Sequence, residues 1–176
     1  MNDTPSKGQP FPFRVAAIDA GSNAIRFVAA EFLDPTHWIE LESQRVPVRL
    51  GHNAFLTGKL DRETMVAAVE TMATFRRAMD NLGIPRYRAV ATSAVRDSRN
   101  GSELVEAIRR ETGIRLETIT GTEEARLVWM ALNSRLDLGD GSWVAVDLGG
   151  GSLEVSLISK EGIHWTESHF MGTVRL

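Results

Sequence analysis

The chain has 176 residues, of which 43% are hydrophobic and 24% charged, a composition typical of a globular protein and not of a disordered or fibrous one. The absence of cysteine excludes a disulfide framework and a thiolate metal site, and it favours a cytoplasmic location. The net charge of −3 argues against a nucleic-acid partner, because binding to a phosphate backbone needs a basic surface. An anionic ligand would therefore need a local cluster of positive or hydrogen-bond-donating groups, since the overall charge of the chain does not attract it.

The chain begins with a segment, MNDTPSKGQPFP, that is polar and rich in proline and glycine. It contains no apolar stretch of the kind that a signal peptide or a membrane anchor requires. We interpret residues 1–12 as a flexible tail and expect no membrane partner.

Three strands are expected after this tail. The apolar segments Arg14–Ala20 and Ile25–Phe32 are short enough to be strands, and the sequence GSNA separates them. A third strand is expected within His37–Leu50.

A helix is expected from Asp61 onward, where apolar residues begin to recur at spacings near those of an α-helix. Asp61 can cap the start of this helix, and Gly83 with Pro85 ends it. The next apolar segment, Tyr87–Ser93, predicts a strand.

A second helix and a further strand follow. Asn100, with Glu103 three residues later, resembles a capping box that opens a helix, which Gly113 closes. Ile114–Thr120 predicts the next strand. A third helix then covers the sequence GTEEARLVWMALNSRL.

The first turn of this third helix contains two adjacent acids, Glu123 and Glu124. Their side chains diverge by about 100°, so at most one is expected to face a given site. Glu124 precedes Leu127 and Val128 by three and four residues, which puts it on their side of the helix. The residues expected to pack inward on the sheet are Leu127, Val128, Ala131 and Leu132.

The order of these elements, βββαβαβα, predicts an α/β fold with a mixed sheet and helices packed on it. This topology resembles the ribonuclease H-like fold of actin-like ATPases. Three further strands are expected after Gly141, without following helices.

The first pair of strands and a later pair resemble each other. VAAIDAGSNAIRFVAA and VAVDLGGGSLEVSLI can be aligned with Asp19 on Asp147 and Gly21 on Gly149. Such internal similarity indicates two copies of one lobe. We therefore predict a first lobe over residues 13–138 and the start of a second, incomplete lobe over residues 139–176, and we interpret the chain as a fragment of a longer protein.

Both glycine turns are candidate phosphate sites. Successive N–H groups that point one way form an anion-binding concavity, and without side chains a phosphate oxygen can approach them. Asp19 and Asp147, at the strand ends, are placed to hold Mg²⁺ or Mn²⁺, because hard cations prefer oxygen ligands. The residues expected to bind phosphate are Gly21, Ser22, Asn23, Gly149, Gly150, Gly151 and Ser152.

Two further charged residues are candidates for the same site. Glu154 follows the second turn and could be a metal or water ligand, the alternative being a solvent-facing strand residue. Arg96 comes just after a predicted strand, where a guanidinium could bind phosphate oxygens bidentately. The alternative for Arg96 is a surface salt bridge with Asp97.

Five segments together resemble the exopolyphosphatase and guanosine pentaphosphate phosphohydrolase family, within the actin, sugar-kinase and Hsp70 superfamily. They are AIDAGSNAIRF, ATSAVRDSRNG, ITGTEEARLVWMAL, VAVDLGGGSLEVSLI and MGTVRL, and they occur in the family order. Two residues depart from the family pattern. Ala24 stands where the family often has serine, and Leu153 where it often has threonine.

The resemblance implies a metal-dependent hydrolase that releases the terminal phosphate of inorganic polyphosphate or the γ-phosphate of guanosine pentaphosphate, with a part in the stringent response. It implies that Glu124 is the general base, that Arg96 and the turn Gly149–Ser152 contact phosphate, and that Asp147 and Glu154 surround the metal. A homodimer of the full-length protein is a further expectation.

Three alternatives remain open from the sequence. An ATP-dependent phosphotransferase or ATPase of the same superfamily would use the same two turns, but it needs an adenosine pocket in the second lobe. A non-catalytic sensor would bind polyphosphate or guanosine tetra- and pentaphosphate without turnover and would signal by closure of the lobes. An actin-like assembly protein would polymerise with a nucleotide.

Overall fold

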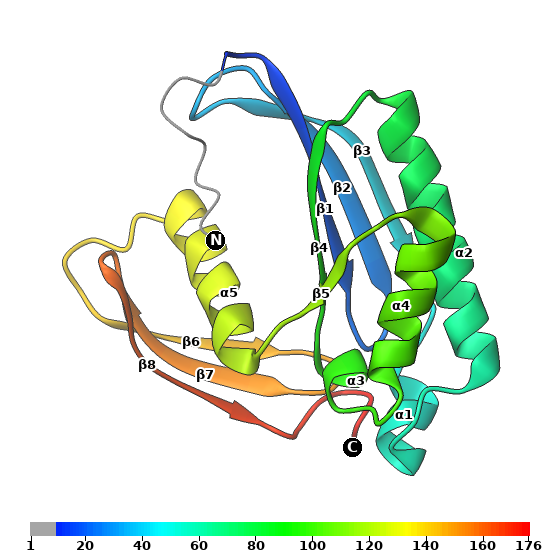
Figure 1. Ribbon diagram of the computed structural model, residues 1–176. Coiled ribbons are helices and arrows are strands. Elements are labelled where there is room, and N and C mark those ends of the chain that lie inside the picture. The colour runs from blue at the N-terminus through cyan, green and yellow to red at the C-terminus, as the bar shows by residue number, and fades with distance from the viewer. Residues whose placement is uncertain (1–9) are drawn as a thin grey trace.

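The computed structural model describes residues 10–176 as two β-sheets with helices around them (Figure 1). Residues 1–9 of the expected tail lie outside the described residues. The first sheet has five strands in the order β3-β2-β1-β4-β5, and the second has three in the order β6-β7-β8. In chain order the elements are β1 (Phe13–Ala20), β2 (Ile25–Phe32), β3 (Trp38–Val46), α1 (Gly51–Thr57), α2 (Arg62–Asn81), β4 (Arg86–Ala91), α3 (Ser93–Arg96), α4 (Gly101–Thr112), β5 (Leu116–Thr118), α5 (Gly121–Arg135), β6 (Trp143–Leu148), β7 (Leu153–Ser159) and β8 (Gly162–His169).

The first sheet is mixed, as the sequence predicts. Its first three strands pair antiparallel through β1·β2 and β2·β3, whereas β4 pairs parallel with both β1 and β5. Parallel neighbours need crossover connections, and these contain α2 before β4 and α4 before β5. The two helices pack against each other over one face of the sheet (Figure 1).

The main core lies between this face and the two helices. Side chains alternate along β1 and β2, so Ile18 and Phe27 point inward and are fully buried. Phe27 stacks on Phe75 of α2, with the ring centroids 5.1 Å apart. Asp61 caps α2 as expected, because its carboxylate accepts a hydrogen bond from the Thr64 N–H at 2.8 Å.

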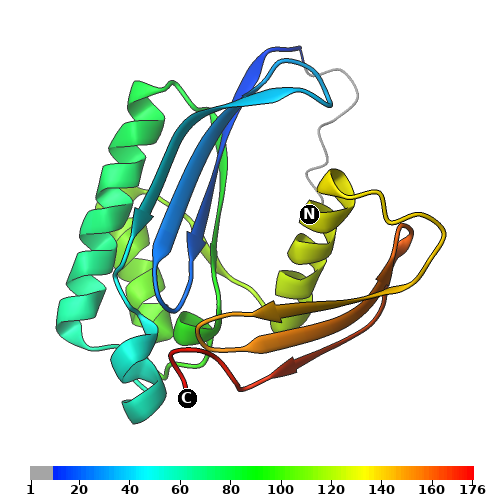
Figure 2. The same ribbon diagram turned by 180° about the vertical axis from the view of Figure 1, so that it is seen from behind.

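The other face of the first sheet looks toward α5 and the second sheet (Figures 1 and 2). Helix α5 packs on β6, β7 and β8. The indole of Trp129 holds it there by donating a hydrogen bond to the carbonyl of Ser159, 2.9 Å away. The three strands after Gly141, which were expected without following helices, are therefore covered on this face by the helix that precedes them. On the opposite face of β6, Val144 and Val146 are exposed.

Two local predictions about the helices are wrong. Ala131 is exposed, because α5 packs on the narrow second sheet, and Leu127, Val128 and Leu132 are only half-buried. Helix α4 does begin after Asn100, but this residue makes no capping hydrogen bond. Its side-chain amide instead bonds the backbone N–H and carbonyl of Leu60, both at 2.9 Å, and so ties α4 to the segment before α2.

Two short helices, α1 and α3, were not expected from the sequence. Helix α3 takes the place of the end of the strand predicted over Tyr87–Ser93, because β4 stops at Ala91. Both helices lie beside the ends of β1 and β4, near the C-terminus of the chain (Figure 1). In the part of the chain that the structure describes, no helix combines the length and the hydrophobicity that crossing a membrane requires.

Candidate functional site

The two glycine turns lie against each other where the two sheets meet. A Cβ atom built on Gly150 would be 3.0 Å from the Cβ of Ser22 and 3.6 Å from the backbone nitrogen of Asn23. A Cβ on Gly151 would overlap the Phe55 ring of α1 and the Ser93 hydroxyl of α3. Glycine is therefore required here, because the backbone of the second turn touches the first turn and both short helices.

The carbonyl groups of the three glycines in the second turn have partners in the segment that follows β8. The N–H of Thr173 donates to the carbonyl of Gly149 at 3.1 Å, and the N–H of Val174 donates to that of Gly150 at 2.8 Å. The Nε atom of Arg175 donates to the carbonyl of Gly151 at 2.6 Å. The segment Thr173–Arg175 therefore fixes the direction of three successive peptide planes.

The N–H groups of the same peptides point the other way. In a planar trans peptide, the C=O of one residue and the N–H of the next are antiparallel. Because the three carbonyls face Thr173–Arg175, the N–H groups of Gly150, Gly151 and Ser152 face away from it, and they have no hydrogen-bond partner within the described residues. Such a row of free N–H groups is suited to binding an anion.

The first turn is held in a similar way. The carbonyl of Ser22 accepts a hydrogen bond from the N–H of Gly51 at 2.7 Å, and the carbonyl of Asn23 accepts one from Arg49 at 3.0 Å. The buried hydroxyls of Ser22 and Ser93 share a hydrogen bond of 2.9 Å. The structure thus brings together the two turns that contain the residues predicted to bind phosphate.

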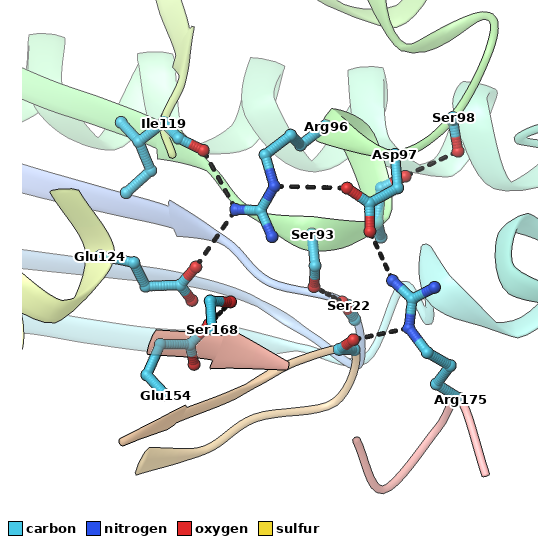
Figure 3. A network of polar contacts seen from close by, with 12 residues as sticks. Ser22, Ser93, Arg96, Asp97, Ser98, Ile119, Glu124, Glu154, Ser168 and Arg175 are labelled. Atoms are coloured by element: carbon cyan, nitrogen blue, oxygen red, sulfur yellow. Dashed lines mark hydrogen bonds and ion pairs between the residues drawn. The ribbon is translucent and has the colours of Figure 1, made fainter. Parts of the chain in front are cut away.

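Arg96 lies at the end of α3, beside these turns (Figure 3). Its guanidinium donates to the carbonyl of Ile119 at 3.1 Å and to the Glu124 carboxylate at 3.5 Å. Its Nε atom is 3.3 Å from the Asp97 carboxylate. Arg96 therefore pairs with Asp97, although this ion pair is mostly buried and not on the surface, and it also lies beside the candidate site.

Glu124 lies in the first turn of α5 and is mostly buried, with 20% of its side chain exposed. Burial raises the pKa of its carboxyl from 4.5 to about 7, and the nearby charge of Glu154 acts in the same direction. The charge of Arg96 opposes this shift. A carboxyl with a pKa near neutrality can accept a proton from water, as a general base must.

Glu123 has the opposite environment. Its carboxylate accepts hydrogen bonds from Arg126 at 2.6 Å and from Arg88 of β4 at 2.9 Å. Hydrogen bonds from Arg126 and Arg88 lower the pKa of Glu123 to about 2. The arginine contacts hold Glu123 away from Arg96 and leave Glu124 as the acid of α5 that faces the glycine turns.

Asp19 and Asp147 end their strands on the side of the two turns. Burial raises the pKa of Asp19, and the negative charge of Asp147 adds to this, although Arg26 opposes it through an ion pair of 3.2 Å. The carboxylates of Asp19 and Asp147 are therefore close enough to repel each other.

Glu154 is a buried strand residue and does not face solvent, because only 2% of it is exposed. Its Oε1 atom accepts a hydrogen bond from Ser168 at 2.8 Å, but its buried Oε2 atom has no hydrogen-bond partner among residues 10–176. Gly121 permits this arrangement, since a Cβ there would be 2.8 Å from the Ser168 side chain. Glu154 and Asp147 line the same small cavity, of about 10 Å³, which has the size of a single water.

The donor set fits a hard divalent cation. Asp19, Asp147 and Glu154 offer carboxylate oxygens, and the unpaired Oε2 atom of Glu154 is a buried acceptor that lacks a positive partner. Within the described residues, no group of three or more His, Asp or Glu side chains is close enough to hold a metal by itself. Mg²⁺ fits such a site, because it usually takes one or two carboxylates together with substrate oxygens and water.

Several residues at the site were not singled out by the sequence analysis. Ser93, Asp97 and Arg175 contact the predicted residues directly. Asp97 was considered only as a surface partner of Arg96. Arg175 belongs to the quoted segment MGTVRL, whose position against the glycine turn follows from long-range contacts that a local pattern does not contain.

The close contacts of Gly151 generate a first prediction. Gly151→Ala should lose stability by about 1–3 kcal/mol, because overpacked side chains must shift to accept the new methyl group. It should also lose affinity for phosphate compounds, because the turn moves. Urea unfolding and titration calorimetry with methylenediphosphonate would measure both effects. Gly141→Ala is the matched control, since the nearest atom to its Cβ would be 3.7 Å away. Equal behaviour of the two variants would contradict the close contact.

The raised pKa of Glu124 generates a second prediction. The folded protein holds this proton more tightly than the unfolded chain does, so the wild type loses stability as the pH rises from about 4.5 to about 7. Gln cannot lose a proton. Glu124→Gln should therefore gain about 1–3 kcal/mol relative to wild type between pH 5 and pH 8, measured by urea unfolding without metal.

Glu123→Gln is the control for this measurement. The pKa of Glu123 is lowered to about 2, so its carboxylate is ionised in the folded protein at both pH values. Its stabilising ion pairs are then almost equally present at both, and the cost of Glu123→Gln should change little between pH 5 and pH 8. A pH-independent difference for Glu124→Gln would show that Glu124 is not desolvated in the folded protein.

Comparison with known proteins places the chain in a family. The model of the Ppx/GppA phosphatase family matches residues 34–176. Exopolyphosphatase 2 of Mycobacterium tuberculosis is 33% identical over 171 residues, which cover 93% of this chain and 53% of that protein. Exopolyphosphatase 1 of Mycobacterium leprae is 29% identical over 143 residues, which cover 81% of this chain and 42% of that protein. The chain thus spans about half the length of these relatives.

Solved structures agree with this result. The crystal structure of an exopolyphosphatase from Cytophaga hutchinsonii has a TM-score of 0.88 and 30% identity, over 92% of this chain and 52% of that one. The Aquifex aeolicus member of the Ppx/GppA family has a TM-score of 0.81 and 28% identity, over 92% of this chain and 52% of that one. MreB5 of Spiroplasma citri, at 13% identity and a TM-score of 0.51, shares the fold alone.

These similarities confirm the expected ribonuclease H-like, actin-like fold and the family resemblance of the sequence. Because the family model covers residues 34–176, well over half of the chain, this chain belongs to the Ppx/GppA phosphatase family.

Proposed function

We propose that the protein containing this chain hydrolyses the terminal phosphoanhydride bond of inorganic polyphosphate. The observation that carries the proposal is the row of free N–H groups at Gly150, Gly151 and Ser152, next to an arginine and a carboxyl whose pKa is about 7. Two relatives named as exopolyphosphatases support the choice of substrate.

The terminal phosphoryl group would bind at the junction of the two turns. In phosphoryl transfer, negative charge lies on the equatorial oxygens, and a fixed set of donors must stabilise it. The N–H groups of Gly150–Ser152 supply such donors without reorganisation, because their carbonyls are already bonded. Arg96 adds a cation that can donate charge-assisted hydrogen bonds to phosphate oxygens.

Glu124 would hold and activate the attacking water. Its carboxylate is 3.5 Å from Arg96, so a water bonded to Glu124 would lie beside a phosphate bonded to Arg96. The raised pKa of Glu124 suits proton abstraction near neutral pH. Water would attack the terminal phosphorus, the bond to the bridging oxygen would break, and Glu124 would take the proton of the water.

A divalent cation, Mg²⁺ or Mn²⁺, is part of the proposal. Asp147 and Glu154 would hold it, with Asp19 on the opposite turn as a further oxygen ligand, directly or through water. When bound, the cation would neutralise phosphate charge and the leaving oxygen. The unpaired Glu154 oxygen supports this assignment.

Guanosine pentaphosphate is a second substrate that the same groups could hydrolyse, because its 5′ end carries the same kind of terminal phosphoanhydride. The name of the family to which the chain belongs, Ppx/GppA, joins two phosphatases, which supports considering a second substrate. Cytoplasmic location, a part in the stringent response and a homodimer stay predictions from the sequence.

The roles of the two acids of α5 give the central test. Glu124→Gln in the full-length product of the reading frame should release phosphate from polyphosphate about 10²- to 10⁴-fold more slowly, the usual cost of losing a general base. Glu123→Gln should remain within a few fold of wild type. Phosphate release would be measured side by side with polyphosphate and guanosine pentaphosphate. The reverse order of the two variants would assign the base to Glu123, and an inactive wild type would overturn the proposed function.

The metal assignment gives another prediction. Asp147→Ala should lose nearly all of the Mg²⁺-stimulated phosphate release while its unfolding midpoint stays close to wild type, because Asp147 lies at the edge of the second sheet and not in the main core. Asp140→Ala is the matched control, since Asp140 is 93% exposed and pairs with Lys160 at the surface. An unchanged dependence on Mg²⁺ concentration in Asp147→Ala would remove this residue from the site.

A further inference from the structure

One carboxylate at the site is shared by two arginines from distant parts of the chain. Asp97 follows α3, and its Oδ1 atom is 3.3 Å from the Nε of Arg96. Its Oδ2 atom accepts a hydrogen bond from the Nη2 of Arg175, beyond β8 (Figure 3). Each of the three side chains is only about one fifth exposed.

Arg175 is fixed from several sides. Its Nε atom donates to the carbonyl of Gly151 at 2.6 Å. Its guanidinium lies over the ring of Phe55, 4.0 Å from the centroid, and 5.2 Å from that of Phe170. A planar guanidinium held by a carboxylate, a carbonyl and a ring has little freedom to move. The direction of the Gly151 carbonyl is therefore set by Arg175.

We propose that Asp97 and Arg175 are positioning residues, which hold Arg96 and the turn Gly149–Ser152 in one fixed relation to each other. This inference rests on the proposed function of that site. The connection runs from Arg96 through Asp97 and Arg175 to the carbonyl of Gly151. It ends at the N–H of Ser152, which points opposite to that carbonyl.

The charges of this connection favour anion binding. A carboxylate paired with Arg96 alone would cancel the positive charge that Arg96 offers to phosphate. Because Asp97 is shared with Arg175, the three side chains together keep one net positive charge beside the turn. Because Arg175 balances the charge of Asp97, Asp97 can orient Arg96 without cancelling the positive charge that Arg96 offers to phosphate.

Asp97 also competes with Glu124 for Arg96. The Arg96 guanidinium is 3.3 Å from Asp97 on one side and 3.5 Å from Glu124 on the other. Without the Asp97 charge, Arg96 would be drawn toward the Glu124 carboxylate and away from the phosphate position. Misplacement of a catalytic group by about 1 Å can cost about 10²-fold in rate.

The test is a mutant cycle in the full-length product of the reading frame. Asp97→Asn keeps the size of the side chain but removes its charge. It should lower kcat for short-chain polyphosphate by about 10- to 10²-fold, with a smaller change in KM. In an Arg96→Gln background the same substitution should cost less than about threefold, because Asp97 acts through Arg96. A purely structural role would give the same cost in both backgrounds.

Arg175→Gln tests the other half of the connection. It should weaken the binding of methylenediphosphonate, a non-hydrolysable diphosphate analogue, by about tenfold in calorimetry. The reason is that the Ser152 N–H would no longer be held toward the analogue, and the loss of one hydrogen bond to a charged group has about this effect. Arg14→Gln is the matched control. Arg14 bonds a carboxylate, Glu31, and a carbonyl, that of Leu82, each at 2.8 Å, but it lies far along β1 from the turns.

Each outcome supports or overturns the inference. An equal cost of Asp97→Asn with and without Arg96 overturns it, as does equal analogue binding by Arg175→Gln and Arg14→Gln. A wild type that binds the analogue but releases no phosphate overturns the proposed function alone. The comparison of analogue binding by Arg175→Gln and Arg14→Gln then tests the positioning role by itself. A wild type that neither binds nor hydrolyses overturns both.

Discussion

The site depends on the hydrogen bonds that the segment Thr173–Arg175 makes to the carbonyls of the triple-glycine turn. These bonds fix three peptide planes, and planarity then aims the N–H groups of Gly150–Ser152 away from that segment. A Cβ atom on Gly150 would be 3.0 Å from the Cβ of Ser22, and one on Gly151 would overlap the Phe55 ring, so side chains there would prevent this close packing. Gly150 and Gly151 are thus needed twice, for close packing of the turn and for access of an anion to its backbone.

Electrostatics separates two neighbouring acids with the same intrinsic chemistry. Hydrogen bonds from Arg126 and Arg88 lower the pKa of Glu123 to about 2. Glu124, in contrast, is buried next to Glu154, and its pKa is raised to about 7. The residues Gly121 and Ser168 make this difference possible, since their close contact brings the start of α5 against β8 and so toward Glu154. This backbone approach therefore adds the charge of Glu154 to the burial that raises the pKa of Glu124.

Local patterns in the sequence predicted the strands, the long helices and most of the site. Alternating and helical spacings identified β1, β2 and α2, and the internal similarity placed Asp19 and Asp147 at equivalent strand ends. Patterns could not identify the partner of α5, because one amphipathic face can pack on either sheet. They also missed the role of Asp97, whose second partner is 78 residues away. Only the tertiary fold brings such residues together.

The position of the site at a junction makes its geometry sensitive to how the two sheets are held together. Ser22 and Ser93 belong to the part of the chain around the first sheet, whereas Gly150 and Glu154 belong to the second. The contacts that join them include the two glycine turns, the ring of Phe55 with Arg175, and Asp97 with Arg175. Because hydrogen bonds weaken steeply with distance and angle, a small rotation of one sheet would separate the free N–H groups from Arg96. The ion pair of Asp97 with Arg175 opposes that rotation, since it bridges the two parts at the point where phosphate would bind.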